Sequence, residues 1–301
     1  MNAMRAPMLE RPVDPGLMNM IAGMSLPDQA TLRGILDRVQ QDPLRPATLD
    51  PIGIIHRYIK NESEALPWEI DETTTVAAAM VKPYPDRPVT PLPREFTPMS
   101  DPLDRVLRAR ASRRDYGDTP IALADLSSLL YHTYGIRKHV TAYSQRDFPV
   151  RWSPSAGGLQ SAEIYLIVNR VDGVPQGLHH YNPIDHSLEL LNRGNMRRAI
   201  VNCCMFQDFL QSAGVVVILT SVLERLIWKY GPRGYRHAHL DVGFVGQNLY
   251  LVTTALKLRT CAVAGFREDA VNSLLEIDGR NEFAVLLFPV GTRPTMDAPV
   301  L

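Results

Sequence analysis

Two groups of polar residues in this sequence have the types and spacing that phosphate binding or proton transfer requires. Arg110, Ser112 and Arg114 form the first group, each two residues from the next. Two guanidinium groups and a hydroxyl suit a phosphate dianion, because arginine offers a planar fork of charged donors. The alternative is a solvated basic helix end, stabilised by the helix dipole. Taken alone, the three residues favour that alternative.

Lys229 and Tyr230 form the second group and stand directly before Gly231-Pro232. A lysine serves as a general base only in its uncharged form, which burial favours, and an adjacent tyrosine can relay or share the proton. The ordinary interpretation is a surface lysine beside a half-buried tyrosine.

Two further segments are rich in glycine and other small residues. The segment 153–158, S-P-S-A-G-G, precedes an apolar run and lets the main chain approach a flat ligand closely. By itself it is a turn before a strand. Ala264-Gly265-Phe266 also follows an apolar run, and by itself it supports no functional assignment.

The elements that must position these groups follow from the apolar patterning and from proline placement. We expect helices at 103–114, at 119–135 and at 235–258, the last as a long core helix. Strands are expected at 162–169, 214–220, 260–265 and 282–290, with a hairpin at 178–191 and a mobile polar loop at 137–150. Helices mixed with four or five strands give an α+β class.

Proline content divides the chain into three parts. Seven prolines between Pro83 and Pro102 predict an extended strap over 83–102. Residues 1–82 form an accessory region, partly flexible, with a helix from Ser25 to about Gln41. Residues 103–301 form one compact domain.

Bulk composition excludes several classes of function. Basic and acidic residues number 32 each, which argues against a nucleic-acid or membrane-surface partner. The three cysteines, two of them adjacent, form no metal motif or disulfide framework, and we expect them buried in a reducing compartment. Without a signal peptide or a membrane span, the expected location is cytoplasmic. Dinucleotide-fold, P-loop and hydrolase motifs are missing.

Taken together, the segments resemble the flavin-dependent nitroreductase superfamily and, within it, the SagB-type dehydrogenases that oxidise azoline rings in modified peptides. The resemblance covers about Leu103 to Pro294. It rests on R-A-S-R-R-D-Y at 110–116, R-W-S-P-S-A-G-G at 151–158, W-K-Y-G-P-R-G-Y-R at 228–236 and A-G-F at 264–266. The implied nitroreductase-like fold is an antiparallel-type mixed sheet flanked by helices around a long core helix. It is homodimeric, with two flavins at the subunit interface.

The resemblance implies FMN as the cofactor and no metal. Arg110 and Ser112 would hold its phosphate, and Arg114 would lie near N1 and O2, where a cation stabilises the reduced ring. Gly265, with Ala264 beside it, would present a backbone N–H to N5. Along the isoalloxazine the matching residues are Arg151, Pro154, Ser155 and Gly157.

Other positions match less closely. Asn248 either contacts flavin or is structural, and Arg293 either adds a third charge at the phosphate or is a surface arginine. Gln160-Ser161 stands where many members have an aromatic residue or histidine followed by proline, and Asp241 stands where glutamate is usual.

In azoline dehydrogenases the Lys-Tyr pair is the acid/base couple, so the resemblance gives Lys229 and Tyr230 this role. Converting a thiazoline into a thiazole removes a proton from Cα and a hydride from Cβ. The substrate would be a cyclised peptide or a carrier-bound thiazoline or oxazoline, with a cyclodehydratase complex as the expected partner and dioxygen reoxidising the flavin. The alternatives are a nitro- or quinone reductase using NAD(P)H, which does not need the pair, and a scaffold partner in a peptide-modifying complex.

Overall fold

The computed structural model describes Ile59 and residues 79–295. The chain divides into two units, Met1–Trp68 and Glu69–Leu301, and the description below concerns the second. The helix expected from Ser25 to about Gln41 and most of the accessory region 1–82 lie outside the described residues.

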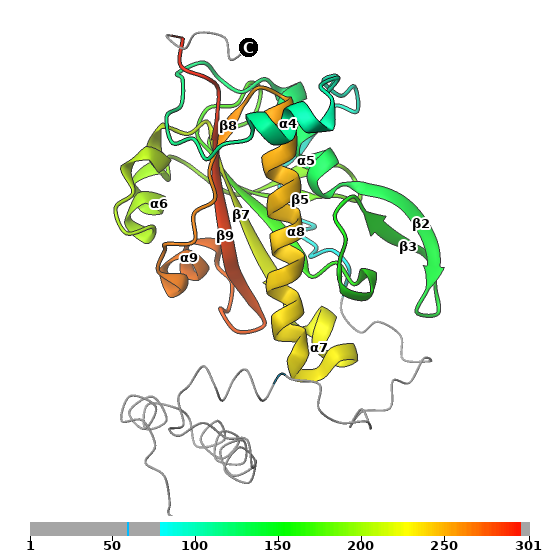
Figure 1. Cartoon of the computed structure of the whole chain (residues 1–301). Helices are drawn as coiled ribbons and strands as arrows, with labels where there is room; N and C mark the ends of the chain where they lie inside the picture. Colours follow the sequence, from blue (N-terminus) through cyan, green and yellow to red (C-terminus); the bar gives the residue numbers. More distant parts are fainter. Residues whose placement is uncertain (1–58, 60–78, 296–301) are drawn as a thin grey trace, which may run out of the picture. The chain divides into compact units, whose positions relative to one another are not determined.

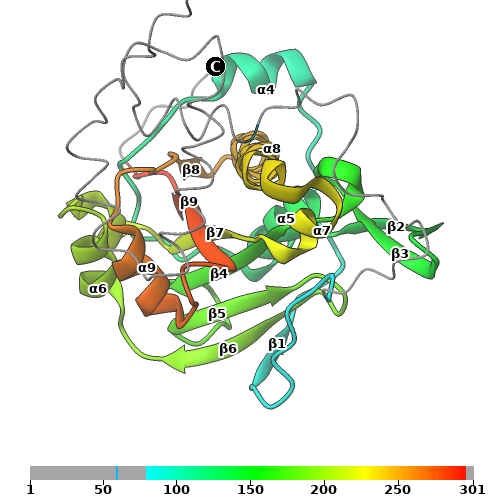
Figure 2. The same cartoon turned by 90° about the horizontal axis from the view of Figure 1, so that it is seen from below.

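A seven-stranded sheet forms the centre of the second unit, with strand order β1-β6-β5-β4-β7-β9-β8 (Figures 1 and 2). All six neighbouring pairs are antiparallel. The α+β class is therefore confirmed, although the sheet has more strands than the four or five expected. The strands are β1 (Val89–Pro91), β4 (Ala162–Val168), β5 (Gly177–Asn182), β6 (Ser187–Arg193), β7 (Val215–Val222), β8 (Arg259–Thr260) and β9 (Glu282–Gly291).

The extra edge strand comes from the proline-rich strap. β1 pairs with β6 through Val89, Thr90 and Pro91. Proline lacks an N–H and is tolerated on a strand with one unpaired side, which explains how this segment joins the sheet only at its edge.

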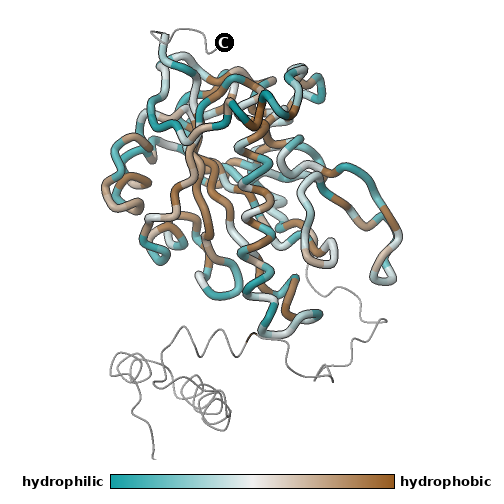
Figure 3. The backbone as a smooth tube through the Cα atoms, viewed as in Figure 1, coloured by the Kyte–Doolittle hydropathy of each residue, from teal (hydrophilic) through white to brown (hydrophobic). Residues whose placement is uncertain are grey.

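The helices cover both faces of the sheet (Figure 2). Side chains of α5 and α8 join one core cluster with Ile164, Leu166 and Val217, whereas α6 and α9 join a second cluster with Tyr165 and Ile167. Successive residues of a strand point to opposite faces, so β4 and β7 are buried along their whole length and are mostly apolar (Figure 3). The helices are α4 (Leu103–Ala109), α5 (Leu123–Tyr134), α6 (Arg197–Cys203), α7 (Glu224–Tyr230), α8 (Gly234–Ala255) and α9 (Glu268–Leu275).

The long helix α8 matches the expected core helix, but one of its sides is open. Tyr235, Leu240 and Phe244 are each about half exposed along it, and Leu103 and Leu107 of α4 are also exposed. Among the described helices, none combines the length and apolarity needed to cross a bilayer. The three cysteines, Cys203, Cys204 and Cys261, are free and buried.

Two sequence-based expectations are wrong. The segment 137–150 is a hairpin of β2 (Ile136–Ala142) and β3 (Gln145–Arg151), not a loop. Its two-residue turn uses Tyr143 and Ser144 at positive φ, where Asn-Gly is the usual signal, so the turn was not recognised. The first helix ends at Ala109, and residues 110–116 are extended rather than helical.

A buried polar network ties α7 to the sheet. The Arg225 guanidinium pairs with Glu163 of β4 and also donates to Gln160 O at 3.1 Å and Ala79 O at 2.8 Å. Both ring nitrogens of His180 face carboxylates, Glu163 at 3.0 Å and Glu189 at 2.7 Å. Burial alone would raise the pKa of Glu163, but the charges of Arg225 and His180 outweigh it and that pKa is lowered.

The network makes stability depend on pH through His180. Burial by itself would lower the pKa of His180, but its hydrogen bonds with Glu163 and Glu189 outweigh burial and the pKa is raised. The protonated ring therefore adds stability that is complete below about pH 6.5 and is lost as pH rises through the folded-state pKa.

We predict that the unfolding free energy of wild type exceeds that of H180Q by the largest amount at pH 6. Above pH 6, this difference in unfolding free energy should fall by at most about 1.4 kcal/mol per pH unit. Urea unfolding of both proteins from pH 6 to pH 9 measures it, and a constant or growing difference would contradict it.

Candidate functional site

Lys229 and Tyr230 meet the glycine turn that the sequence had singled out. Gly157 lies at φ +59°, and a Cβ built on it would come within 2.7 Å of Tyr230 Oη, 2.8 Å of Tyr143 Oη and 3.1 Å of Lys229 Nζ. Three polar side-chain ends therefore converge on the bare side of this residue. They come from the end of α7 and from the tip of the β2–β3 hairpin.

The small-residue turn itself is fixed by Asp241 of α8. One carboxylate oxygen accepts from Ala156 N at 2.9 Å, and the other accepts from Ser155 Oγ at 2.8 Å and Ser161 Oγ at 3.0 Å. Burial raises the pKa of Asp241, while these donors work in the opposite direction. Asp241 thus holds residues 155–161 on the helix and leaves Gly157 exposed.

Burial keeps the Tyr230 hydroxyl protonated at neutral pH. Burial raises its pKa, and the nearby charge of Lys229 reduces that effect only in part. The Lys229 ammonium lies 4.6 Å from the Tyr143 ring centroid and 5.5 Å from that of Tyr230. A cation between two aromatic rings and next to a phenol hydroxyl is an arrangement in which protons can be exchanged.

A second group of predicted residues gathers around Tyr250, farther along α8. Tyr250 Oη shares a hydrogen bond of 2.9 Å with Ser112 Oγ and accepts from Ala262 N at 2.7 Å, and the Arg110 guanidinium lies over its ring. Asp241 and Tyr250 are nine residues apart, which is about 14 Å along a helix. One chain therefore carries two separate groups of candidate residues on α8.

Gly265 and Arg114 lie near this second group. Gln207 Nε2 donates to Gly265 O at 2.7 Å, and the Arg114 guanidinium lies 5.8 Å from the Phe209 ring in the same segment. Ala264 and Gly265 are exposed, and the Gly265 N–H has no hydrogen-bond partner among residues 79–295. A free donor thus lies on the surface, and the segment 207–209 contacts both Gly265 and Arg114.

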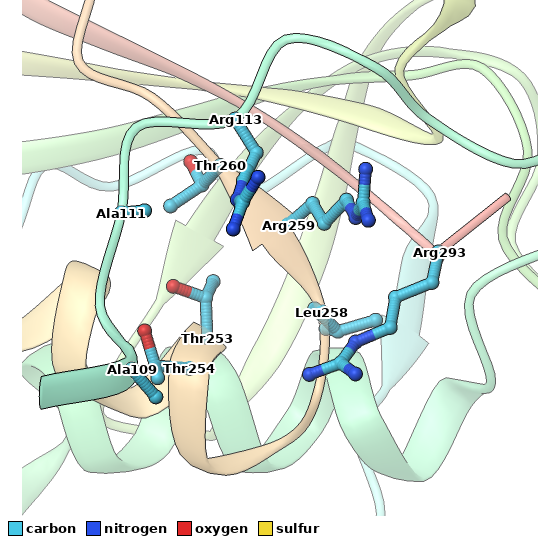
Figure 4. Close-up of a pocket in the computed structure, with 9 residues that line it drawn as sticks. All are labelled: Ala109, Ala111, Arg113, Thr253, Thr254, Leu258, Arg259, Thr260 and Arg293. Atoms are coloured by element: carbon cyan, nitrogen blue, oxygen red, sulfur yellow. The ribbon is translucent and has the colours of Figure 1, made fainter. Parts of the chain in front are cut away.

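Arg293 lines a pocket with other basic residues (Figure 4). Ala109 contributes from the end of α4, and Ala111 and Arg113 contribute from the extended segment. Arg110 and Ser112 of that segment contact Tyr250, so its alternate residues face the two places. Arg293 Nε donates to Lys257 O at 3.1 Å, and Arg259 pairs with Asp115. The geometry therefore groups Arg293 with Arg113 rather than with Ser112.

The remaining predicted residues differ in exposure. Arg151 is buried, with its guanidinium 4.5 Å from the Tyr134 ring and Nη2 donating to Met80 O at 3.0 Å. Asn248 donates to Ser153 Oγ at 2.9 Å, which supports the turn. Pro154 is exposed beside it. Within the described part of the chain, no group of three or more His, Cys, Asp or Glu residues could hold a metal ion.

Sequence reasoning missed Tyr143 and Arg225. Tyr143 lay in the supposed loop, although Val140, Ala142, Phe148 and Val150 alternate with polar residues as strands do. Arg225 carries no sequence signal, because its three partners come from distant segments.

Comparison with known proteins gives a consistent family. A sequence model of the nitroreductase family matches residues 107–292. A nitroreductase-family protein of Methanocaldococcus jannaschii is 35% identical over 191 residues, covering 64% of this chain and 91% of that protein. The trifolitoxin-processing protein TfxB of Rhizobium leguminosarum is 26% identical over 175 residues, and the microcin B17-processing protein McbC of Escherichia coli is 25% identical over 134 residues. This chain spans about half of each processing protein, 47% and 48%.

Solved structures share the fold. A nitroreductase-family protein of Anabaena variabilis superposes with a TM-score of 0.64 at 24% identity, over 84% of this chain and 49% of that one. A chain of the E. coli microcin synthetase McbBCD complex, solved with truncated pro-MccB17 bound, gives a TM-score of 0.51 at 15% identity, over 94% and 98% of the two chains. The expected nitroreductase-like fold is thereby confirmed.

The crowding at Gly157 can be tested against a matched glycine. Gly173 also has a positive φ, +72°, but a Cβ there would meet no atom within 4 Å. We predict that G157A and G173A each lose about 1–2 kcal/mol of stability from the left-handed backbone. Only G157A should displace Lys229 and speed its acylation by an amine-reactive ester, read by peptide mass spectrometry. Equal Lys229 acylation rates in the two variants would contradict the placement.

Proposed function

This chain belongs to the nitroreductase family, and from that premise we propose that it is an FMN-dependent azoline dehydrogenase. Its substrate would be a thiazoline or oxazoline ring in a modified peptide or a carrier-bound intermediate, which it converts to the azole. The observation that carries the proposal is the convergence of Lys229 and Tyr230 on Gly157.

The Lys229–Tyr230 arrangement supports a proton-transfer role. Both side chains end at the one turn whose small residues allow a flat ring to approach, and the turn is held rigidly by Asp241. Simple hydride transfer between a nicotinamide and a flavin requires no base at this place. Removal of the Cα proton of an azoline does require one.

The second group of residues fits the anionic cofactor. Arg110 and Arg114 form no ion pair with described residues, and the Gly265 N–H has no partner among them. Two uncompensated guanidinium groups suit a phosphate and an electron-rich pyrimidine edge. Arg110 and Ser112 would hold the phosphate, Arg114 would lie near N1 and O2, and Gly265, beside Ala264, would donate to N5.

In the proposed reaction, bound FMN supplies the acceptor for the hydride that leaves Cβ. Lys229 would act as the general base that accepts the Cα proton, and the electrons of the broken Cα–H bond would form the new ring double bond as the hydride leaves Cβ. Tyr230 stays protonated and can return or relay a proton beside Lys229. The exposed turn at Pro154, Ser155 and Gly157 would support the ring, with Arg151 and Asn248 buttressing it from behind.

We propose that the chain assembles as a homodimer, and the separation of the two groups on α8 supports this. One chain places Tyr250 and Asp241 about 14 Å apart on the helix, with the half-exposed Leu240 and Phe244 on the same helix. A second copy packed on this apolar side would complete each site with residues from both chains and cover the stripe. Relatives named for trifolitoxin and microcin B17 processing support a peptide substrate. A cyclodehydratase complex is the partner that we propose to supply the azoline.

A nitro- or quinone reductase is the competing function, because the M. jannaschii relative carries the nitroreductase name. Such an enzyme would be reduced rapidly by NAD(P)H. Stopped-flow bleaching of the flavin by NADPH distinguishes the two, and a fast reaction would favour the reductase.

We predict that Arg110→Ala weakens FMN binding roughly 10- to 100-fold, because it removes a charge-assisted hydrogen bond. Arg108→Ala is the matched control, since it removes the same charge from an exposed position two residues earlier. Titration of FMN fluorescence gives both affinities. A protein that binds no FMN, or equal losses in the two variants, would overturn the assignment.

We predict that Lys229→Ala lowers azole formation roughly 10²- to 10⁴-fold, the usual contribution of a general base, while FMN affinity is retained. Lys138→Ala, on an exposed hairpin position, should behave as wild type. Mass spectrometry of an azoline peptide reads the loss of two hydrogens per ring. Undiminished turnover in Lys229→Ala would remove this residue from the mechanism.

A further inference from the structure

We propose that Tyr143 is a positioning residue that holds the Lys229 amino group in place through both of its protonation states. This inference rests on the proposed function, because it assigns Tyr143 a part in the base chemistry of Lys229.

The hydroxyl of Tyr143 is the centre of a short hydrogen-bonded chain. Lys229 Nζ donates to Tyr143 Oη at 2.6 Å, and Tyr143 Oη donates to Gly157 O at 2.6 Å. The chain runs from α7 across the hairpin tip to the glycine turn, so the tyrosine links all three parts of the site. Without its hydroxyl, neither the lysine nor the carbonyl has this partner.

The hairpin holds the Tyr143 ring independently of the hydroxyl. The ring centroid lies 5.4 Å from that of Phe148, a buried residue, and 5.6 Å from that of Trp228 in an edge-on contact. Such contacts fix the ring plane through apolar and aromatic packing. Replacing tyrosine with phenylalanine therefore removes the hydrogen bonds and leaves the packing.

A phenol hydroxyl suits a base that changes its charge. Towards an ammonium group the oxygen acts as an acceptor, and the proton is free to point at Gly157 O. Towards a neutral amine the O–H can turn and become the donor, while the exposed carbonyl takes water. Tyr143 can thus keep Lys229 Nζ beside the turn before and after it receives a proton, which phenylalanine cannot do.

The backbone at the hairpin tip is shaped for this placement. Tyr143 and Ser144 both have positive φ, +51° and +57°, which is unfavourable for side-chain-bearing residues. The turn presents Tyr143 towards Lys229 and leaves Ser144 exposed. Strained tip geometry is a cost that the contacts of Tyr143 with α7 and the glycine turn can offset.

The first arm of the test needs no substrate. Lys229 acylation by an amine-reactive ester is followed by peptide mass spectrometry in wild type, Tyr143→Phe and Thr141→Val, with exposed Lys138 as internal reference. We expect several-fold faster labelling of Lys229 in Tyr143→Phe alone, because the free amino group is no longer held. Unchanged labelling would overturn the proposal whether or not the protein oxidises azolines.

The second arm measures turnover of an azoline peptide. Tyr143→Phe should lower kcat roughly 10- to 100-fold, as expected for a lost charge-assisted hydrogen bond, with KM changed by less than about twofold and FMN affinity intact. Thr141→Val, on an exposed position of the same hairpin, should match wild type. A rise in KM with loss of FMN would indicate a purely structural role and refute the proposal. If wild type itself does not oxidise azolines, the proposed function fails while the labelling arm still decides the contact.

Discussion

The buried ion pair between Arg225 and Glu163 is the constraint on which the candidate site depends. Both side chains are almost fully buried, at 2% and 1% exposure, so the pair must be satisfied completely or not form at all. The remaining donors of Arg225 reach Gln160 O and Ala79 O, and His180 takes the other oxygen of Glu163. One guanidinium therefore links α7, the end of the glycine turn at Gln160 and the main chain at Ala79 to β4 of the sheet, and Lys229 follows one helical turn later.

This arrangement explains how a mobile side chain can serve a defined chemical role. Lysine has a flexible stem, and its position is normally averaged over many rotamers. Here the helix that carries it is anchored at Arg225, the turn opposite is anchored at Asp241, and the Tyr143 and Tyr230 rings flank the ammonium. Polar contacts inside a protein are strong when every member has a partner, which is the case at both anchors.

Local patterning predicted most of the fold, and long-range pairing accounts for what it missed. The mostly apolar, fully buried runs of β4 and β7, the hairpin of β5 and β6 and the helix α8 were all predicted, because burial on both faces leaves a signal in consecutive residues. The strap strand β1 was missed because its edge pairing depends on β6, which is distant in the sequence: Thr90 pairs with Leu188, 98 residues later. At the site, motif resemblance located Lys229 and Gly157, but Tyr143 and Arg225 act only through contacts that no local pattern encodes.

Hydrogen exchange in Arg225→Lys tests most directly whether the buried pair positions the site. Lysine keeps the charge but lacks the planar fork, so it cannot reach Glu163, Gln160 O and Ala79 O together. The account predicts that backbone amides of α7 (Glu224–Tyr230) exchange markedly faster in the variant while those of β4 and β7 keep their protection. Unchanged exchange in α7 would show that the helix is held by other contacts and would contradict the account.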